Sequence, residues 1–321
     1  MPVVCRRRVG GPLVSGRAWA RRLGAVGLLA AAVGTSAGCA ADAASYTGPS
    51  PLPGALPVVA TTTLLADMVR QVGSSHVSVT SLVPKGGDVH TFDPRPSEAW
   101  SLSGARLVIA NGLGLDNWLT QLAADVGTDG PVVHLGENLP GVSYIVEDGQ
   151  TNPHLWLDVA NAELYVDRIE TALIAADPAD ADAFRAGHDA YRARLGGLDA
   201  WARGQLAALP AANRRIVSYH DALPYFCRAY GLIVVGNVVA APGQDPSAKE
   251  IQALIDAMRS NGVRAIFSEA QFSPELARTI AAEAGATVVS NLYTDTLGDS
   301  PVDTYEGVVR WDVGHIAEAL R

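Results

Sequence analysis

A repeated alternation of short β-branched runs with helical patterns constrains the fold of this chain more than any other feature of its sequence. The runs form two series, at 57–62, 77–83, 106–110 and 131–135 and again at 215–219, 232–236, 264–268 and 286–290. Helical patterns separate the runs, at 64–72, 97–102, 117–126, 222–230, 247–260 and 274–284. Strands that alternate with helices are typical of parallel βαβ units. The sequence therefore predicts an α/β fold with two small parallel-sheet lobes.

One long helical pattern lies between the two series. Phe184, Tyr191 and Leu195 fall at helical spacing, and Asp177-Pro178 is a start signal for a new helix. A helix from about 179 to 208 would be roughly 45 Å long. Gly196-Gly197 predicts a kink inside it, because each glycine costs about 1 kcal/mol relative to alanine. We predict that this helix joins the lobes, with boundaries at 57–177 for the first lobe, 178–210 for the helix and 211–321 for the second lobe.

The amino terminus differs in character from the rest of the chain. Residues 1–22 contain six arginines and no acidic residue, and they precede an apolar run at 23–33 and small residues at 34–38. This order is typical of a secretory signal, and the apolar run is short for a membrane-spanning helix. We expect residues 1–38 to be a signal peptide and the protein to act outside the cytoplasm. An uncut membrane anchor is the alternative interpretation.

Cys39 ends a Ser-Ala-Gly-Cys sequence that resembles a lipobox, in which the cysteine is acylated and becomes the new amino terminus. Ser36 stands where the usual pattern has an aliphatic residue. The residues after Cys39 are rich in proline, glycine and serine, so 39–56 is predicted to be a flexible tether. We therefore expect a lipid anchor at Cys39 that holds the protein to the cell membrane.

The charge and the cysteine content narrow the class of protein. The chain has 24 basic and 33 acidic residues, and six of the basic residues precede Cys39, which leaves a balance of about −15 after cleavage. Such a balance argues against nucleic-acid binding, which needs a basic surface. Cys227 would remain as the one unmodified cysteine, and its apolar neighbours predict a buried thiol rather than a nucleophile.

Four residues that can bind a metal ion lie next to predicted strands and helices. His90 follows a strand in a glycine-rich loop, and His220 lies at the end of another strand. His154 precedes a helical pattern, and Asp295 lies just beyond the last predicted strand. Open parallel sheets bind ligands outside the carboxyl ends of their strands. Because each series supplies two of these residues, we expect a site in the cleft between the lobes.

Three neutral imidazoles and one carboxylate suit a tetrahedral Zn²⁺ site, whereas Mn²⁺ would be expected to use more oxygen ligands. Asp88, Asp158 and Asp221 lie beside these histidines in the sequence and could orient their rings. Trp156 is expected to shield the site from water. The spacing alone leaves open that these are ordinary loop residues. The remaining histidines are expected at the surface or in packing: His76, His134, His188 and His315.

Several motifs give the chain a family resemblance. In segment 90–97 a histidine precedes an aromatic residue, prolines and a serine. Segment 153–158 reads Pro-His-Leu-Trp-Leu-Asp, and segment 220–226 begins His-Asp-Ala and ends Tyr-Phe. With these motifs, the chain from about 58 to 320 resembles the solute-binding lipoproteins of zinc and manganese ABC importers. The resemblance implies a fold of two α/β lobes joined by one backbone helix, and metal ligands at His90, His154, His220 and Asp295.

The resemblance also implies what the protein does. It predicts a carrier rather than an enzyme, a monomer that captures Zn²⁺, or alternatively Mn²⁺, and delivers it to an ABC permease with its ATPase. His220 favours zinc, because many manganese carriers of the family have glutamate at this position. Glu269 also matches a family position and is interpreted as a residue that supports a ligand. Residues 136–151 lack the long loop rich in histidine and acids that many zinc carriers have, which puts an auxiliary metal-gathering role in doubt.

Two other functions stay open at this point. A zinc hydrolase would keep one metal position free for water, whereas four protein ligands close it, and the chain has no His-Glu-x-x-His motif. A metal-dependent adhesin is a role proposed for some members of this family. If the protein were only an adhesin, the four candidate metal ligands would have no evident function.

Overall fold

Residues 50–128, 130–147 and 149–321 are described by the computed structural model. The predicted signal peptide at 1–38, the expected lipidation site Cys39 and most of the predicted tether lie outside the described residues. Within the described ranges, no helix combines the length and the apolar character that a membrane crossing requires.

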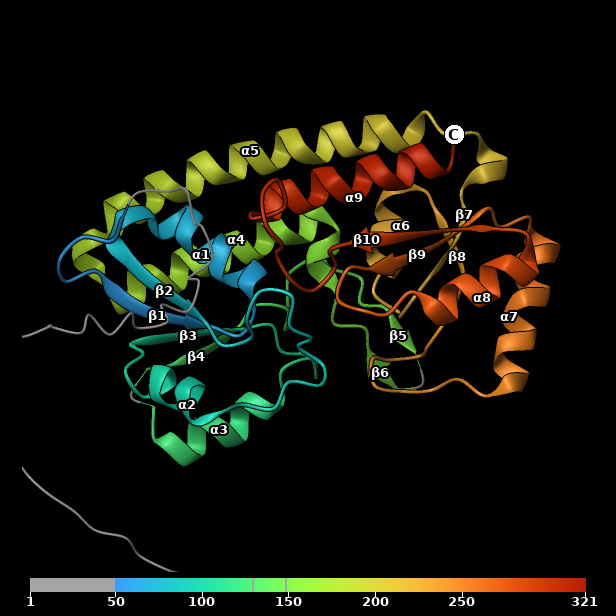
Figure 1. The fold of residues 1–321 in the computed structure, drawn as a ribbon. Helices are drawn as coiled ribbons and strands as arrows, with labels where there is room; N and C mark the ends of the chain where they lie inside the picture. The colour runs from blue at the N-terminus through green and yellow to red at the C-terminus, as the bar shows by residue number, and fades with distance from the viewer. Residues whose placement is uncertain (1–49, 129, 148) are drawn as a thin grey trace, which may run out of the picture. The chain divides into compact units, whose positions relative to one another are not determined.

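A parallel sheet forms the centre of the first lobe (Figure 1). Its strands lie in the order β2-β1-β3-β4, and β3 is buried along its whole length, as expected for a strand covered by helices on both faces. The strands are β1 (Leu56–Ala60), β2 (Val77–Ser81), β3 (Leu107–Ala110) and β4 (Val132–His134). The helices of this lobe are α1 (Thr63–Gly73), α2 (Pro96–Ser103) and α3 (Trp118–Val126).

A second parallel sheet forms the centre of the other lobe. Its order is β10-β9-β7-β8, which matches the first sheet when it is counted from β8. The strands are β7 (Arg215–Ser218), β8 (Ile233–Asn237), β9 (Ala265–Glu269) and β10 (Thr287–Leu292). The helices are α6 (Pro224–Tyr230), α7 (Ala248–Asn261), α8 (Glu275–Ala284) and α9 (Tyr305–Ala319).

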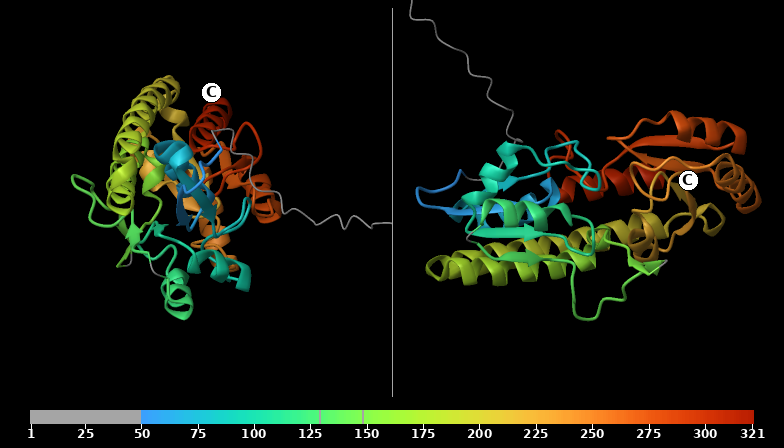
Figure 2. Two further views of the ribbon diagram at one scale, coloured as in Figure 1. Left: turned by 90° about the vertical axis from the view of Figure 1, so that its left-hand side faces the viewer. Right: turned by 90° about the horizontal axis from the view of Figure 1, so that it is seen from below.

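Two consecutive helices, α4 (Val159–Ala176) and α5 (Ala181–Ala207), lie between the two sheets in the sequence. α5 contacts α1 and α4 beside the first sheet and α6 and α9 beside the second, so it runs along both lobes (Figures 1 and 2). The predicted α/β fold of two parallel-sheet lobes with a long helix is confirmed. The glycine pair at Gly196-Gly197 lies inside this continuous helix. The residue boundaries given above for the lobes stay predictions.

Short elements complete the described chain. A hairpin of two-residue strands, β5 (Val146–Glu147) and β6 (Gln150–Thr151), was not predicted, because such short strands carry no alternation. The short 3-10 helices are η1 (Ser74–His76), η2 (Leu155–Leu157), η3 (Pro178–Asp180) and η4 (Ala211–Asn213).

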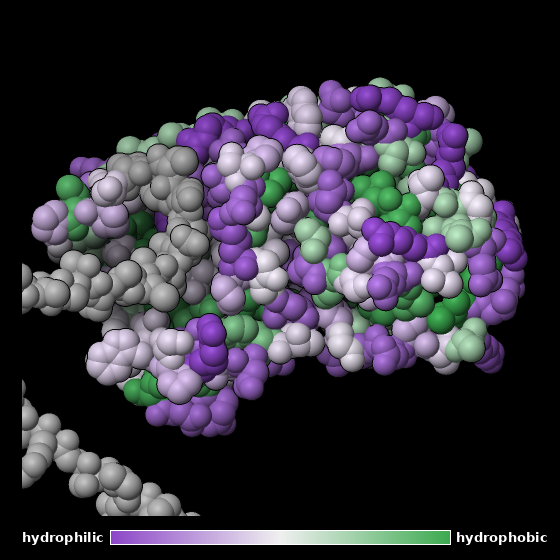
Figure 3. Space-filling model, viewed as in Figure 1, coloured by the Kyte–Doolittle hydropathy of each residue, from purple (hydrophilic) through white to green (hydrophobic). Residues whose placement is uncertain are grey.

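The largest apolar core runs through both lobes rather than stopping at their boundary. It joins Leu107 of the first sheet and Phe267 of the second to Leu195 of α5, and all three side chains are buried. Smaller clusters lie between each sheet and the helices on its outer face. On the face shown in Figure 3, hydrophilic residues are spread over both lobes with apolar residues between them. The continuous core favours a fixed arrangement of the two lobes.

Candidate metal centre

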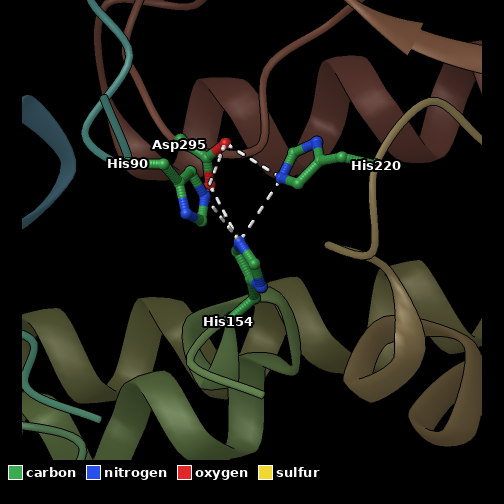
Figure 4. Close-up of side chains that lie close together, drawn as sticks. All are labelled: His90, His154, His220 and Asp295. Carbon is green, nitrogen blue, oxygen red and sulfur yellow. Dashed lines mark hydrogen bonds and ion pairs between the residues drawn. The ribbon is translucent and has the colours of Figure 1, made fainter. Parts of the chain in front are cut away.

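The four residues singled out in the sequence come together in space (Figure 4). His90 lies in the loop between β2 and α2, and His154 immediately precedes η2. His220 lies two residues beyond β7, and Asp295 lies three residues beyond β10. The carboxyl ends of parallel strands therefore carry three of the four residues, as the rule for open α/β sheets predicts.

The donor atoms of these residues are separated by distances that a single metal ion can span. The Nε2 atom of His154 lies 3.3 Å from Nε2 of His90 and 3.4 Å from Nε2 of His220. The Asp295 carboxylate lies 3.5 Å from His154 Nε2, 3.4 Å from His220 Nε2 and 4.0 Å from His90 Nε2. With zinc bonds of about 2.0–2.1 Å, neighbouring donors of a tetrahedron lie about 3.3 Å apart. One Zn²⁺ ion can thus reach all four residues with small adjustments.

Burial differs among the four residues. His154, His220 and Asp295 are almost completely buried. The side chain of His90 is 18% exposed, so it forms the solvent side of the cluster. Trp156 is also buried, and its ring centroid lies 5.3 Å from that of His154. The cluster is therefore shielded on all sides except that of His90.

Burial and the mutual charges shift the pKa values of the cluster in opposite directions. Burial lowers the pKa of His154 well below its usual value and lowers the pKa of His90 as well. Burial also opposes a charge on His220, but the carboxylates of Glu269 and Asp295 outweigh it and raise the pKa of His220 well above its usual value. Burial would raise the pKa of Asp295, yet the imidazoles, His220 first, hold it below its usual range. A metal ion would thus meet two neutral imidazoles and would displace a proton from His220.

The second ring nitrogen has a different surrounding in each of the three imidazoles. Nδ1 of His220 lies 2.9 Å from the Glu269 carboxylate, and Glu269 is itself buried. Nδ1 of His154 lies 3.0 Å from the side-chain oxygen of Asn152. The corresponding nitrogen of His90 has no partner among the residues that the structure describes. Such partners fix the orientation and the tautomer of a histidine ligand.

The acids that follow or precede the histidines in sequence do not contact the imidazole rings. Asp158 accepts a hydrogen bond from Ala160 N and caps the start of α4. Asp88 accepts hydrogen bonds from the backbone N–H of His90 and from Thr91 Oγ1, and so shapes the loop. Asp221 accepts hydrogen bonds from two asparagine side chains instead of from a ring.

A cavity of about 560 Å³ lies beside the cluster and is lined by both lobes. Its wall includes His90, His154 and His220, with Pro153 on the first lobe and Pro242 on the second. The cavity therefore gives an ion a route from solvent to the buried donors.

The other histidines have different surroundings. His76 pairs with Asp180 at 2.9 Å, and His188 lies 2.9 Å from carboxylates of Asp167 and Asp189. In the part of the chain that the structure describes, no second group of histidine, cysteine and acidic side chains gathers as closely as the four-residue cluster. Cys227 is buried, and burial raises the pKa of its thiol, so it is a poor nucleophile.

Sequence reasoning missed the role of Asn152, which lies two residues before His154. Its side chain contacts both His154 and Asp221, which are 67 residues apart. The one sequence signal for this contact was that Asn152, a polar residue, lies two positions before His154. The contact with Asp221 depends on how the two lobes meet, which no local pattern records.

Comparisons with known proteins agree with this arrangement. The family model described as "Zinc-uptake complex component A periplasmic" matches residues 58–319. The manganese-binding lipoprotein MntA of Bacillus subtilis (strain 168) is 31% identical over 293 residues, which cover 88% of this chain and 94% of that protein. The iron-binding protein YfeA of Yersinia pestis is 28% identical over 266 residues, which cover 82% and 86%.

Solved structures show the same fold. The periplasmic zinc-binding protein TroA from Treponema pallidum superimposes with a TM-score of 0.77 at 27% identity, covering 83% of this chain and 99% of that one. A cadmium-bound periplasmic metal-binding protein from Candidatus Liberibacter asiaticus gives a TM-score of 0.75 at 25% identity, covering 82% and 99%. The names and titles of these relatives mention manganese, iron, zinc and cadmium, so the likeness by itself does not single out one metal.

Proposed function

The chain belongs to the family of periplasmic zinc-uptake components, and we propose that it captures one Zn²⁺ ion outside the cytoplasm and delivers it to an ABC permease. The observation that carries this proposal is the cluster of His90, His154, His220 and Asp295, whose donor atoms all lie within 4.8 Å of one another. Two of the proposed ligands precede α5 and two follow it, so one ion would hold both lobes together.

Zinc is the proposed cargo because of the donor set. Three imidazoles and one carboxylate suit Zn²⁺ better than Mn²⁺, which prefers more oxygen ligands. The buried carboxylate of Glu269, 2.9 Å from His220 Nδ1, supports this choice, since it would make the His220 ring a stronger zinc ligand. Mn²⁺ is the alternative cargo, in keeping with the name of the manganese-binding relative.

The geometry of this site fits a metal carrier better than a zinc enzyme. Catalytic zinc normally has three protein ligands and an open position for water, whereas four protein ligands would close the coordination sphere. The near-complete burial of His154, His220 and Asp295 leaves an approach only on the side of His90. We propose a closed site that holds its ion until the permease disturbs a ligand loop.

The proposed location follows from the amino-terminal sequence. Acylation of Cys39 would tether the protein to the outer face of the cell membrane, near the permease and its ATPase. One acyl chain alone binds a membrane weakly, so contacts with the permease would add to the attachment. We propose that the carrier works there as a monomer.

Capture and release would involve small movements. Several hydrogen bonds tie the segment from Thr294 to Tyr305 to the first lobe. They include Trp156 Nε1 to Thr294 O, Leu297 N to Thr63 Oγ1, Gly86 N to Thr296 Oγ1 and Tyr305 N to Asp67 Oδ2, with donor–acceptor distances of 2.8–2.9 Å. Together with α5 and the shared core, these bonds oppose wide hinge opening.

Small-angle scattering of metal-free and zinc-loaded protein tests this mechanism. The two forms should have nearly equal radii of gyration, and a large compaction on zinc loading would contradict the mechanism.

Native mass spectrometry of the purified protein with competing Zn²⁺ and Mn²⁺ tests the proposed cargo. We expect one Zn²⁺ per chain in the presence of excess Mn²⁺, and loss of that ion in His220→Ala. His188→Ala is the matched control, because His188 also lies among carboxylates but away from the cluster. Preferential loading with Mn²⁺, or equal zinc loading in the His220 variant, would overturn the assignment.

Growth in zinc-limited medium tests transport as opposed to adhesion. A strain that carries His154→Ala should grow as poorly as a deletion strain, and His188→Ala should support normal growth. Normal growth with His154→Ala would favour the adhesin alternative over transport.

A further inference from the structure

We propose that Asn152 is a positioning residue for metal capture, which holds the His154 ring in its metal-binding tautomer and joins it to the segment that carries His220. This inference rests on the proposed function, since it assigns a part of the same site. Asn152 is 8% exposed and lies in the wall of the cavity beside the cluster. Its side chain is therefore placed between solvent and the buried ligands.

Two backbone groups fix the orientation of the Asn152 amide. On one side, the backbone carbonyl oxygen of Asp221, which can only accept, lies 2.7 Å from Nδ2 of Asn152. On the other side, the backbone N–H of His154, which can only donate, lies 3.1 Å from Oδ1 of Asn152. The reverse orientation would set donor against donor and acceptor against acceptor. The amide oxygen therefore faces His154.

This orientation determines which nitrogen of His154 carries the proton. Nδ1 of His154 lies 3.0 Å from the same Asn152 oxygen, which can only accept, so Nδ1 must be the donor. The neutral ring then has a free lone pair on Nε2, the atom that lies between His90 and His220. Asn152 thus aims the lone pair of His154 at the position of the ion.

The same amide also links the two lobes. Nδ2 of Asn152 donates to the carboxylate of Asp221 at 2.9 Å, and Asn237 Nδ2 donates to the other oxygen of that carboxylate at 2.9 Å. Asn237 in turn accepts a hydrogen bond of 2.6 Å from Ser218 Oγ at the end of β7. Because Asp221 follows His220 directly, this chain of bonds couples the orientation of His154 to the placement of His220.

Zinc affinity, measured by competition with a chromophoric chelator, tests the proposal on the purified protein. Asn152→Ala should weaken Zn²⁺ binding by about 10–100-fold, as is typical for loss of a partner of a metal-bound histidine. Asp221→Ala should weaken binding less, because the Asn152 amide would keep its bonds to His154 and to the backbone of residue 221. Asn213→Ala is the matched control: its amide joins the segment before β7 to the carboxyl terminus and does not contact the cluster.

A spectroscopic readout separates positioning from a merely structural effect. In ¹⁵N NMR spectra of the metal-free protein, the His154 ring should show the tautomer with hydrogen on Nδ1, and Asn152→Ala should shift it toward a mixture. Unchanged zinc affinity in Asn152→Ala, or an equal loss in Asp221→Ala, would overturn the positioning role. Failure of the unaltered protein to bind zinc at all would instead refute the proposed function, so the two failures can be told apart.

Discussion

The two sheets share one strand order but use the crevice at their carboxyl edge in opposite ways. In each sheet, the second strand in the sequence lies on one side of the first strand and the third strand lies on its other side. The connections after these strands therefore diverge, and the crevice that can bind a ligand lies between the first and third strands. In the second lobe, β7 leads to His220 and β9 ends at Glu269, and the two side chains meet at 2.9 Å. In the first lobe, the equivalent crevice between β1 and β3 is filled by the carboxylate of Asp116.

Hydrogen bonding explains the difference. Asp116 accepts bonds from Thr61 Oγ1 at 2.8 Å, from Asn111 N at 2.7 Å and from Gly112 N at 2.9 Å, so both of its oxygens are satisfied. In the second lobe, one buried oxygen of Glu269 and one of Asp295 have no hydrogen-bond partner. Both carboxylates lie beside the His220 imidazole, at 2.9 and 3.4 Å, so positive charge on this ring offsets the cost of their burial. The first crevice thus holds a carboxylate whose bonds stabilise the fold, whereas under the proposed function the second holds carboxylates that orient or bind the ligands of a metal ion.

Removal of Asp116 should have the largest effect on stability. Asp116→Ala leaves two buried backbone N–H groups without an acceptor, and each such group costs about 1–3 kcal/mol, so a loss of roughly 3 kcal/mol is expected. Urea unfolding of the metal-free protein measures it. Asp125→Ala is the control, because Asp125 is exposed and should change stability by less than about 0.5 kcal/mol. If Asp116→Ala had normal stability but did not bind zinc, the first crevice would serve metal binding rather than the stability of the fold.

Glu269→Gln should show the opposite behaviour. The amide keeps an oxygen near His220 Nδ1 but loses the charge that strengthens this ligand, so zinc affinity should fall by about 10–100-fold. The stability of the metal-free protein should hardly change, since a buried charge is removed together with its interactions. Chelator competition and urea unfolding of the same variant measure the two quantities. A large loss of stability with unchanged zinc affinity would mean that Glu269, like Asp116, serves the fold rather than metal binding.

The pH dependence of stability should reveal how Asp67 contributes to the contact between the lobes. It lies in α1 and accepts a hydrogen bond from Tyr305 N of the second lobe, and burial raises its pKa to about 6. The folded protein then holds this proton to higher pH than the unfolded chain, so the contribution of Asp67 to stability falls as pH rises from about 4 to 6.

Asp67→Asn should therefore match the unaltered protein at pH 4 and exceed its stability by about 1–2 kcal/mol at pH 7. The gain is smaller than the full pKa shift implies, because asparagine has one acceptor oxygen where Asp67 offers two, to Tyr305 and to Gln71. Thermal unfolding across this pH range measures it. A variant that is less stable at pH 7 would show that the ionised carboxylate holds the lobes together.

The smallest effect is expected at the surface pair between the lobes. Lys85 Nζ lies 3.1 Å from the carboxylate of Asp299, whose side chain is 97% exposed. Exposed pairs of this kind are worth about 0–1 kcal/mol and are screened by salt. Asp299→Asn should leave both stability and zinc affinity nearly unchanged in unfolding and competition assays at moderate salt. A marked loss would mean that surface charge, rather than the buried bonds, fixes the lobes.

The sequence predicted the features that depend on local patterns. All eight strands of the two sheets lie within one or two residues of the β-branched runs, and His220 and Asp295 could be placed at strand ends. The contacts of Asn152 and Asp116 could not be predicted, since they depend on which side chains meet across loops and lobes. The bond from Trp156 Nε1 to Thr294 O joins residues 138 positions apart, and only the assembled core brings them together. α5 continues through Gly196-Gly197 without a break, because packing against both lobes outweighs a weak local preference.

X-ray absorption spectroscopy at the zinc edge tests the central claim most directly. Protein loaded with one equivalent of Zn²⁺ should show a four-coordinate ion with three imidazoles, one carboxylate oxygen and no sulfur, and His220→Ala should lose one imidazole. A site with fewer than three imidazoles, or a six-coordinate shell dominated by oxygen, would contradict it.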